Sequence, residues 1–294
     1  MPESSPTAGG RQPSGAAGRP SAFDPDSVNR GTWRRSETVD QYRRLRGWTD
    51  PGEERAVASV AARVRGQPVL DIGMGAGRTA ALLAPIAGEY LGVDYTAEMV
   101  QAARAGHPSM RFEHMDARDL SALPAAHYAL AMFSFNGIDS VAVADRSTIL
   151  AQVHRVLRPD GLFIVSAHNR HGPGAGERPR LAIAWTPNPV RLAWRIARQL
   201  GTLPRAISNH RKWSRVNEVH DDWAVMNAGA HDFGIVMVYT SLAEQKRQLR
   251  EAGYVVEAVY DSAVGALVGD GDDTRKAWWF HYVARKPSAS AARK

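Results

Sequence analysis

The chain of 294 residues contains no cysteine. This absence excludes disulfide bonds, thiolate-ligated zinc and a cysteine nucleophile, and it suits a reducing compartment. Long apolar runs are missing as well, since none approaches the roughly 18 to 20 residues that a membrane-spanning helix needs. The N-terminus has neither the basic start nor the apolar stretch of a signal peptide. We therefore expect a soluble protein of the cytoplasm, without stable membrane insertion.

Large apolar side chains are scarce at the beginning of the chain. Residues 1–22 are mainly Ser, Gly, Pro, Ala and Arg, which cannot offset the entropy of ordering by burial. We predict a disordered tail there and a second one over residues 288–294. The overall composition, 44% hydrophobic and 23% charged, is typical of one globular core with an elaboration. We assign this core to residues 23–168 and 241–287, and an insert to residues 169–240.

The net charge of +7 is unevenly distributed along the chain. Between Asn169 and Tyr239 there are ten Arg and Lys against five Asp and Glu, so this stretch holds about five of the seven net charges. An asymmetry of this kind indicates a surface for a partner or a substrate.

Short apolar runs alternate with helical segments at intervals of roughly 20 to 25 residues, the pattern of βα units in a parallel sheet. The predicted strands are 68–72, 90–93, 110–114, 128–133, 161–167, 255–260 and 278–285. Helical patterns cover 40–65 in two segments, and then 78–87, 97–105, 147–157 and 241–252. We predict an α/β fold with a mostly parallel seven-stranded sheet that is flanked by helices.

A glycine-rich turn follows the first of these strands, in the run VLDIGMGAGRT over residues 69–79. Glycine permits a tight turn and lets a ligand lie against backbone without a Cβ in the way. About twenty residues further on, Asp94 ends the second strand, where a carboxylate can accept both hydroxyls of a ribose. Asp116 follows the third strand and Phe133 ends the fourth. Because ligands of open α/β sheets bind at the carboxyl ends of strands, these residues predict one binding site.

Taken together, this order of motifs resembles the class I S-adenosylmethionine-dependent methyltransferases over roughly residues 40–168 and 241–287. The resemblance implies a Rossmann-like fold and S-adenosylmethionine as the cofactor. It implies that Asp71, Gly73, Gly75 and Gly77 hold the methionine part, that Asp94 binds the ribose and that Asp116 binds the adenine. The other cofactor-binding residues that we expect are Tyr42, Tyr95, Met99, Ala117 and Phe133.

Two further segments, FSFNGID over residues 133–139 and SAHN over residues 166–169, resemble a group of natural-product methyltransferases. This implies transfer of a methyl group to an N or O nucleophile of a small molecule, with Asn136, Asp139 and Asn169 as acceptor-binding residues. Such a transfer depends mainly on positioning, and a general base is optional. The candidates for a catalytic base are His168, His231 and the phenol of Tyr239.

Other functions remain open at this point. A nucleic-acid methyltransferase could use the basic insert together with its tryptophans, and a protein that only binds S-adenosylmethionine could have lost the acceptor site. A nicotinamide dehydrogenase is disfavoured, because Arg78 stands where its fingerprint has Gly or Ala. Asn136, Asp139, His168 and Asn169 partly imitate a magnesium site, but hard cations prefer more carboxylates, so we assign no metal. We expect a monomer or a homodimer.

One helix of the insert is amphipathic. Its apolar face contains Val190, Ala193, Trp194, Ala197 and Leu200, and its basic face contains Arg191, Arg195 and Arg198. We expect a lid helix that packs the apolar face on the core, within an insert that forms the acceptor side of the site. Docking on a membrane surface and recognition of an acidic group on the substrate are the alternatives.

Overall fold

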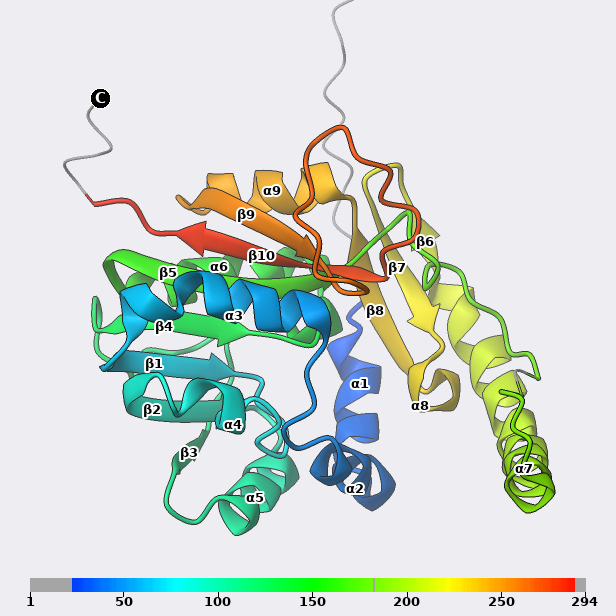
Figure 1. Ribbon diagram of the computed structural model, residues 1–294. Helices are drawn as coiled ribbons and strands as arrows, with labels where there is room; N and C mark the ends of the chain where they lie inside the picture. The colour runs from blue at the N-terminus through cyan, green and yellow to red at the C-terminus, as the bar shows by residue number, and fades with distance from the viewer. Residues whose placement is uncertain (1–22, 182, 289–294) are drawn as a thin grey trace, which may run out of the picture.

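The computed structural model describes residues 23–181 and 183–288. Its main sheet has seven strands in the order β3-β2-β1-β4-β5-β10-β9 (Figure 1). They are β1 (Gln67–Ile72), β2 (Ala87–Asp94), β3 (Arg111–His114), β4 (Tyr128–Phe133), β5 (Leu157–His168), β9 (Val255–Asp261) and β10 (Trp279–Arg285). Only β10 is antiparallel to its neighbours, β5 and β9. The predicted fold class is confirmed. The tail predicted over residues 1–22 lies outside the described residues, as do residues 289–294 of the second tail.

Helices cover both faces of this sheet. On one face α3 (Pro51–Val64) and α4 (Ala80–Leu83) pack against a cluster that contains Val69 and Leu130. On the other face α6 (Val143–Val156) and α9 (Leu242–Glu251) pack against the main cluster around Leu70 and Phe163, and α5 (Ala97–Gly106) lies beside β3. The helix predicted over residues 78–87 is confined to α4, since the glycine turn precedes it and β2 begins at Ala87.

Two N-terminal helices, α1 (Asp26–Trp33) and α2 (Ser36–Arg44), lie alongside the carboxyl ends of the central strands (Figure 1). The sequence predicted a helix only from Asp40 onward, because α1 is short and polar, with eight residues of which only Val28 and Trp33 are large and apolar. The helix is instead fixed by Asn29, which is fully buried. Its Nδ2 donates to the carbonyl oxygens of Ser140 (2.9 Å) and Val236 (2.7 Å), and its Oδ1 accepts from the amide of Val236 (2.9 Å).

The insert contains a second sheet that the sequence analysis did not predict. Its strands β6 (Glu218–Val219), β7 (Trp223–Ala228) and β8 (Ile235–Thr240) are antiparallel. The sheet is joined to the end of β5, because the amide of Arg170 donates to the carbonyl oxygen of Thr240 (3.0 Å). Between β7 and β8, the short helix α8 (Ala230–Phe233) contains His231, Asp232 and Phe233 with φ of 54°, 54° and 58°. This left-handed conformation is costly for residues other than glycine.

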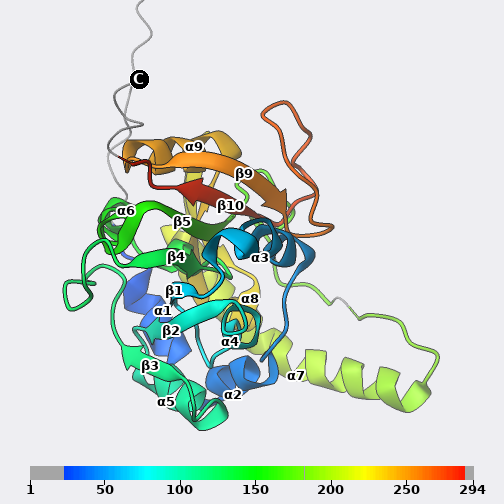
Figure 2. The same ribbon diagram turned by 60° about the vertical axis from the view of Figure 1, so that its left-hand side comes forward.

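Helix α7 (Pro189–Trp213) extends away from the body of the molecule, as Figures 1 and 2 show. The expected packing of its apolar face on the core is therefore wrong. Its C-terminal part is anchored to the body: Asn209 Nδ2 donates to the Asp232 carbonyl oxygen (2.9 Å), and the His210 ring lies edge-on to Phe233. In the part of the chain that the structure describes, no helix combines the length and the apolar character needed to cross a membrane.

Candidate functional site

The turn after β1 brings backbone close to two aromatic rings. Gly73 and Gly75 have φ of +62° and +58°. A Cβ on Gly73 would lie 2.6 Å from Cε2 of Phe133, and a Cβ on Gly75 would lie 2.9 Å from Cδ1 of Tyr42. Both the conformation and the space therefore require glycine. The amide of Gly75 donates to Asp94 Oδ2 (2.9 Å), which connects the turn to the end of β2.

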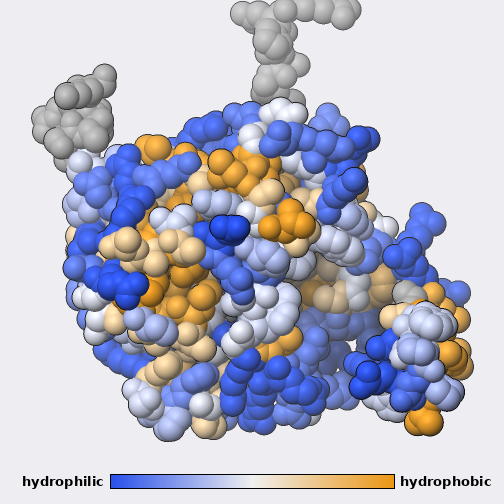
Figure 3. Space-filling model, in the orientation of Figure 1, coloured by the Kyte–Doolittle hydropathy of each residue, from blue (hydrophilic) through white to orange (hydrophobic). Residues whose placement is uncertain are grey.

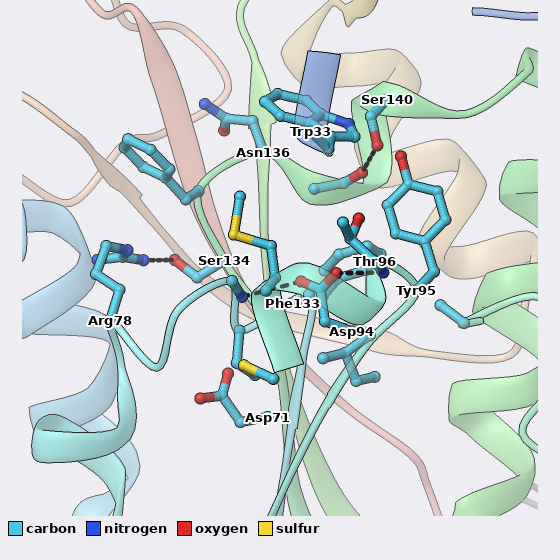
Figure 4. A pocket seen from close by; sticks show the side chains of 18 of the residues that line it. Trp33, Asp71, Arg78, Asp94, Tyr95, Thr96, Phe133, Ser134, Asn136 and Ser140 are labelled. Atoms are coloured by element: carbon cyan, nitrogen blue, oxygen red, sulfur yellow. Dashed lines mark hydrogen bonds between the residues drawn. The ribbon is translucent and has the colours of Figure 1, made fainter. Parts of the chain in front are cut away.

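Two buried carboxylates lie below this turn (Figure 4). Asp71 Oδ2 accepts from the hydroxyls of Thr79 (2.6 Å) and Tyr90 (2.7 Å). Asp94 Oδ1 accepts from the amide of Thr96 (2.8 Å). Burial raises the pKa of each carboxyl group to about 6, although these hydrogen bonds favour the ionised form. Both groups are thus ionised at neutral pH and become protonated in mild acid.

The third predicted cofactor acid, Asp116, belongs to an ion-pair network. Its Oδ1 accepts from the amide and Nε of Arg118 (3.0 Å each), and its Oδ2 accepts from Arg118 Nη2 (2.7 Å) and Arg30 Nη2 (3.0 Å). Burial by itself would raise the pKa of this carboxyl, but the hydrogen bonds from Arg118 bring it below its ordinary value. Arg30 comes from α1, so this network ties the N-terminal helix to the edge of the site.

These residues line one pocket, which we call the strand-end pocket (Figure 4). Together with the open solvent at its mouth it spans about 910 Å³. Of the eleven predicted cofactor residues, ten line it: Tyr42, Asp71, Gly73, Gly75, Asp94, Tyr95, Met99, Asp116, Ala117 and Phe133. Gly77 does not line this pocket. A Cβ on Gly77 would lie 2.8 Å from Cδ2 of His107, so this glycine faces the His107 ring instead.

A second pocket, which we call the aromatic pocket, lies beside the first and encloses about 880 Å³. The insert provides Glu177, His231 and Tyr239, and β5 provides His168. Five residues line both pockets: Trp33, Tyr42, Phe135, Asn136 and Met237. The two pockets therefore share one wall, which the N-terminal helices, the loop after β4 and β8 build together.

His168 reaches the aromatic pocket from the end of β5, and Asp139 holds its ring. Asp139 Oδ2 accepts from the backbone amide of His168 (2.6 Å) and lies 2.9 Å from its Nδ1. A carboxylate in this position favours the proton on Nδ1, which leaves a lone pair on Nε2. Asn136 Nδ2 lies 3.3 Å from that Nε2. Asp139 is fully buried and also accepts from Arg146 Nη1 (2.7 Å), so its position is fixed.

The other two candidate bases line the same pocket in different settings. Burial, assisted by the charge of Arg35, lowers the pKa of His231 to about 4, so its ring is neutral at physiological pH. That ring is stacked on Tyr42, with centroids 6.2 Å apart, and stands edge-on to Trp33 at 5.1 Å. Burial raises the pKa of Tyr239 above its ordinary value, so the phenol keeps its proton. Of the three, only His168 has a carboxylate partner among the hydrogen bonds of the described residues.

The three predicted acceptor-binding residues have different positions. Asn136 lines both pockets, in a left-handed conformation with φ of 60°. Asp139 lies behind His168 and lines neither pocket. Asn169 also lies outside both pockets, because its Nδ2 donates to the carbonyl oxygens of Thr274 (2.7 Å) and Ala277 (2.9 Å). It thus anchors the loop before β10.

Sequence reasoning missed a buried ion pair under the glycine turn. Arg78 Nη1 and Nη2 each donate to a carboxylate oxygen of Glu53 (2.6 Å), and the hydroxyl of Ser134 donates to the same carboxylate. The Arg78 guanidinium also lies over the Phe135 ring, 4.8 Å from its centroid. The available signal was Arg78 itself, a charged residue directly after a glycine turn. Trp33 and Glu177 were missed as lining residues because no motif surrounds them, and Phe135 was missed although it lies within the segment 133–139.

The strand order, the antiparallel β10, the glycine turn after β1 and the acids after β2 and β3 agree with the class I methyltransferase fold that the sequence predicted. Comparison with known families agrees, since residues 69–161 match the family model described as a methyltransferase domain. Residues 69–161 therefore match a methyltransferase domain, in agreement with the sequence prediction. S-adenosylmethionine is the cofactor of that family.

Similar proteins support the same class. A probable S-adenosylmethionine-dependent methyltransferase of Mycolicibacterium smegmatis is 34% identical over 111 residues, which cover 38% of this chain and 42% of that protein. The chain spans between 32% and 53% of the length of the curated relatives that it matches.

Two solved structures share the fold. The 1,6-didemethyltoxoflavin-N1-methyltransferase of Burkholderia thailandensis, solved with 1,6-didemethyltoxoflavin and S-adenosylhomocysteine, has a TM-score of 0.54 and 17% identity, over 98% of this chain and 94% of that one. An S-adenosylmethionine-dependent methyltransferase of Mesorhizobium loti has a TM-score of 0.51 and 20% identity, over 78% and 97%.

Proposed function

We propose that this chain transfers a methyl group from S-adenosylmethionine to an N or O nucleophile of a small molecule. The observation that carries the proposal is the wall shared by two pockets. One pocket contains the residues expected to hold the cofactor, and the other contains the candidate bases. A cofactor and an acceptor bound in these adjoining pockets would meet at their common border, beside Phe135 and Asn136, and close contact is the main requirement of a direct transfer.

The residues of the strand-end pocket fit this cofactor. Each Asp94 carboxylate oxygen accepts one backbone amide and retains lone pairs for the hydroxyls of a ribose. Asp71 and Asp94 are two negative charges, and the cofactor carries a positive sulfonium and an ammonium group. When bound, the cofactor supplies an electrophilic methyl group.

His168 is our choice for the base. An amine or hydroxyl acceptor must lose a proton, and His168 lines the pocket that would hold the acceptor, with Asn136 Nδ2 as the neighbour of its Nε2. Asp139 would stabilise the imidazolium that forms, and Arg146 keeps Asp139 in place. Trp33, Tyr42 and Phe135 would exclude water and stack on a flat acceptor.

The Burkholderia enzyme supports a small acceptor, because its own structure was solved with the small molecule 1,6-didemethyltoxoflavin and with S-adenosylhomocysteine bound. The alternatives of a nucleic-acid methyltransferase and of a non-catalytic binding protein have no comparable support. Neither pocket contains residues from the basic segment 178–217.

Two measurements test the proposal. Calorimetry should detect binding of S-adenosylhomocysteine and no binding of NAD. Incubation with methyl-labelled S-adenosylmethionine and a cell extract should then place the label in the low-molecular-weight fraction. Label in the RNA or protein fraction would replace the small molecule by another acceptor, and binding without any transfer would support the non-catalytic reading.

A further inference from the structure

The arm formed by residues 183–204, which we call the α7 arm, contributes to neither pocket and stands away from the body (Figure 2). Ala206, just beyond the arm, is the only buried residue of α7 among the described ones. Arg195 Nη1 donates to the carbonyl oxygen of Ala184 (2.7 Å), so the segment before the helix folds back along it. A projecting element of this kind needs a partner outside the fold, because its own core does not cover it.

The α7 arm exposes large apolar side chains along one stripe. Val190 is 77% exposed, Trp194 59% and Leu200 54%, and Trp185 in the preceding segment is 78% exposed. At 100° per residue, Val190, Trp194 and Leu200 lie within about one third of the helix circumference, together with Ala193 and Ala197. Figure 3 shows apolar surface on this arm directly next to hydrophilic surface. The arm is therefore amphipathic and its apolar stripe is open.

The charge next to this stripe has a single sign. From Arg178 to Asn217 the chain contains nine Arg and Lys and no Asp or Glu. Arg191 and Arg198 flank the stripe, and within residues 23–181 and 183–288 neither forms an ion pair with an acid. Arg198 lies over the Trp194 ring, 5.4 Å from its centroid, so a cation and an aromatic ring are presented together. This surface thus combines exposed apolar side chains with positively charged side chains next to them.

Three occupants can be compared on these grounds. A second copy of this arm would bring two strongly positive segments together, which disfavours self-association. A nucleic acid would satisfy the arginines but would leave Val190, Ala197 and Leu200 without apolar contact. A lipid surface with anionic headgroups matches both features, since the apolar stripe enters the boundary of the acyl chains and the arginines remain among the headgroups.

We propose that the α7 arm docks this protein on the surface of an anionic lipid bilayer. The helix lies in the interfacial plane, with Val190, Trp194 and Leu200 inserted and with Arg191 and Arg198 at the headgroups. This is peripheral binding that the arm carries alone, and it does not depend on the methyl-transfer proposal.

The test is flotation of the full chain with vesicles of equal parts phosphatidylglycerol and phosphatidylcholine, and with vesicles of phosphatidylcholine alone. We expect binding to the first kind, weaker binding at high salt, and little binding to the second kind. Val190→Glu with Trp194→Glu should lower the partition coefficient at least about tenfold. Arg191→Gln and Arg198→Gln should lower it about fivefold each.

Val264→Glu is the matched control, because Val264 is equally exposed but lies on the loop between β9 and β10, outside the arm. It should bind like the original chain.

The proposal is overturned if the chain does not float with anionic vesicles, or if the arm variants float as well as the control. It is also overturned if light scattering shows a dimer that Trp194→Glu dissociates. Duplex DNA or RNA binding that needs the arginines but not Trp194 would assign the arm to nucleic acid. Unchanged melting temperatures show that the variants are folded.

Discussion

The residues that line the strand-end pocket are mostly close together in the sequence, whereas those that line the aromatic pocket come from distant segments. The first is built mainly from residues 71–149, where each βα unit delivers its contribution at the end of a strand. The second combines residues 33–45, 135–177, 228–239 and 278–279. A binding site made of successive strand ends can be specified by short local motifs, whereas a site made of distant segments depends on how the whole chain packs.

The largest expected effect is a loss of the transfer rate without a loss of cofactor affinity, which would assign different roles to the two pockets. His168→Ala should lower kcat roughly 10²- to 10⁴-fold, because the acceptor loses its base, while the affinity for S-adenosylhomocysteine stays the same. Steady-state kinetics and calorimetry on the same preparation provide both values. His171→Ala, an exposed histidine nearby, serves as the control. Full transfer by His168→Ala at every pH would mean that positioning alone carries the reaction.

A second prediction concerns the buried ion pair of Glu53 with Arg78, whose guanidinium lines the strand-end pocket and lies over the Phe135 ring. Glu53→Leu leaves the Arg78 guanidinium buried without its carboxylate, which should reduce the free energy of unfolding by about 3–5 kcal/mol. Chemical denaturation measures this value. Glu54→Leu changes the adjacent residue, which is exposed, and should cost far less. Equal losses in the two variants would show that Arg78 finds another partner.

The cofactor side is tested on its own by Asp94→Ala. If both ribose hydroxyls bond to this carboxylate, the affinity for S-adenosylhomocysteine should fall by about 1–3 kcal/mol, or roughly 5- to 150-fold. Calorimetry measures the change, with the exposed Asp119→Ala as the reference. Unchanged affinity would refute the assignment of the ribose to Asp94.

The smallest expected effect is the release of protons when S-adenosylmethionine binds. The raised pKa values of Asp71 and Asp94, about 6, mean that both carboxyls are partly protonated in the free protein between pH 5 and 6. A cationic cofactor favours the ionised forms, so binding in this range should release protons, and affinity should fall as the pH drops below 6. Calorimetry of S-adenosylmethionine in two buffers of different ionisation enthalpy detects the release, which should vanish at pH 8.

The same two raised pKa values affect the free protein. Because their folded pKa lies above the ordinary value, the folded chain holds more protons than the unfolded chain between about pH 4 and 6. These two groups therefore make the protein less stable as the pH rises through this window, and their contribution is constant above it.

The main sheet and the strand-end pocket could be predicted because their signals are local. The strands are continuous apolar runs, and the glycine turn and Asp94 follow them directly. β8, IVMVYT, is also a continuous apolar run, but it was missed because it lies in the insert, outside the alternation of strands and helices, and its partner β7 has a mixed composition. Helix α1 was missed because its main anchor is a polar side chain, Asn29, whose partners lie 111 and 207 residues away.

Local patterns also misled in one case. The amphipathic pattern of α7 was recognised from the sequence, but amphipathicity does not say which surface the apolar face meets. We expected the apolar face of α7 to pack on the core, but Trp194 on this face is exposed. For Asn169 it was the resemblance of segment 166–169 that suggested acceptor binding, whereas its Nδ2 donates to the carbonyl oxygens of Thr274 and Ala277.

The hydrogen bonds of Asn29 also bear on the order in which the chain can assemble. The ribosome synthesises Asn29 early and Val236 late, yet α1 reaches its final place only when Val236 offers its backbone to the Asn29 amide. Until then Trp33 cannot complete the wall between the two pockets. A nascent chain that already contains the glycine turn, Asp94 and Asp116 still lacks a closed site, so the enclosed chamber is among the last features to form during synthesis.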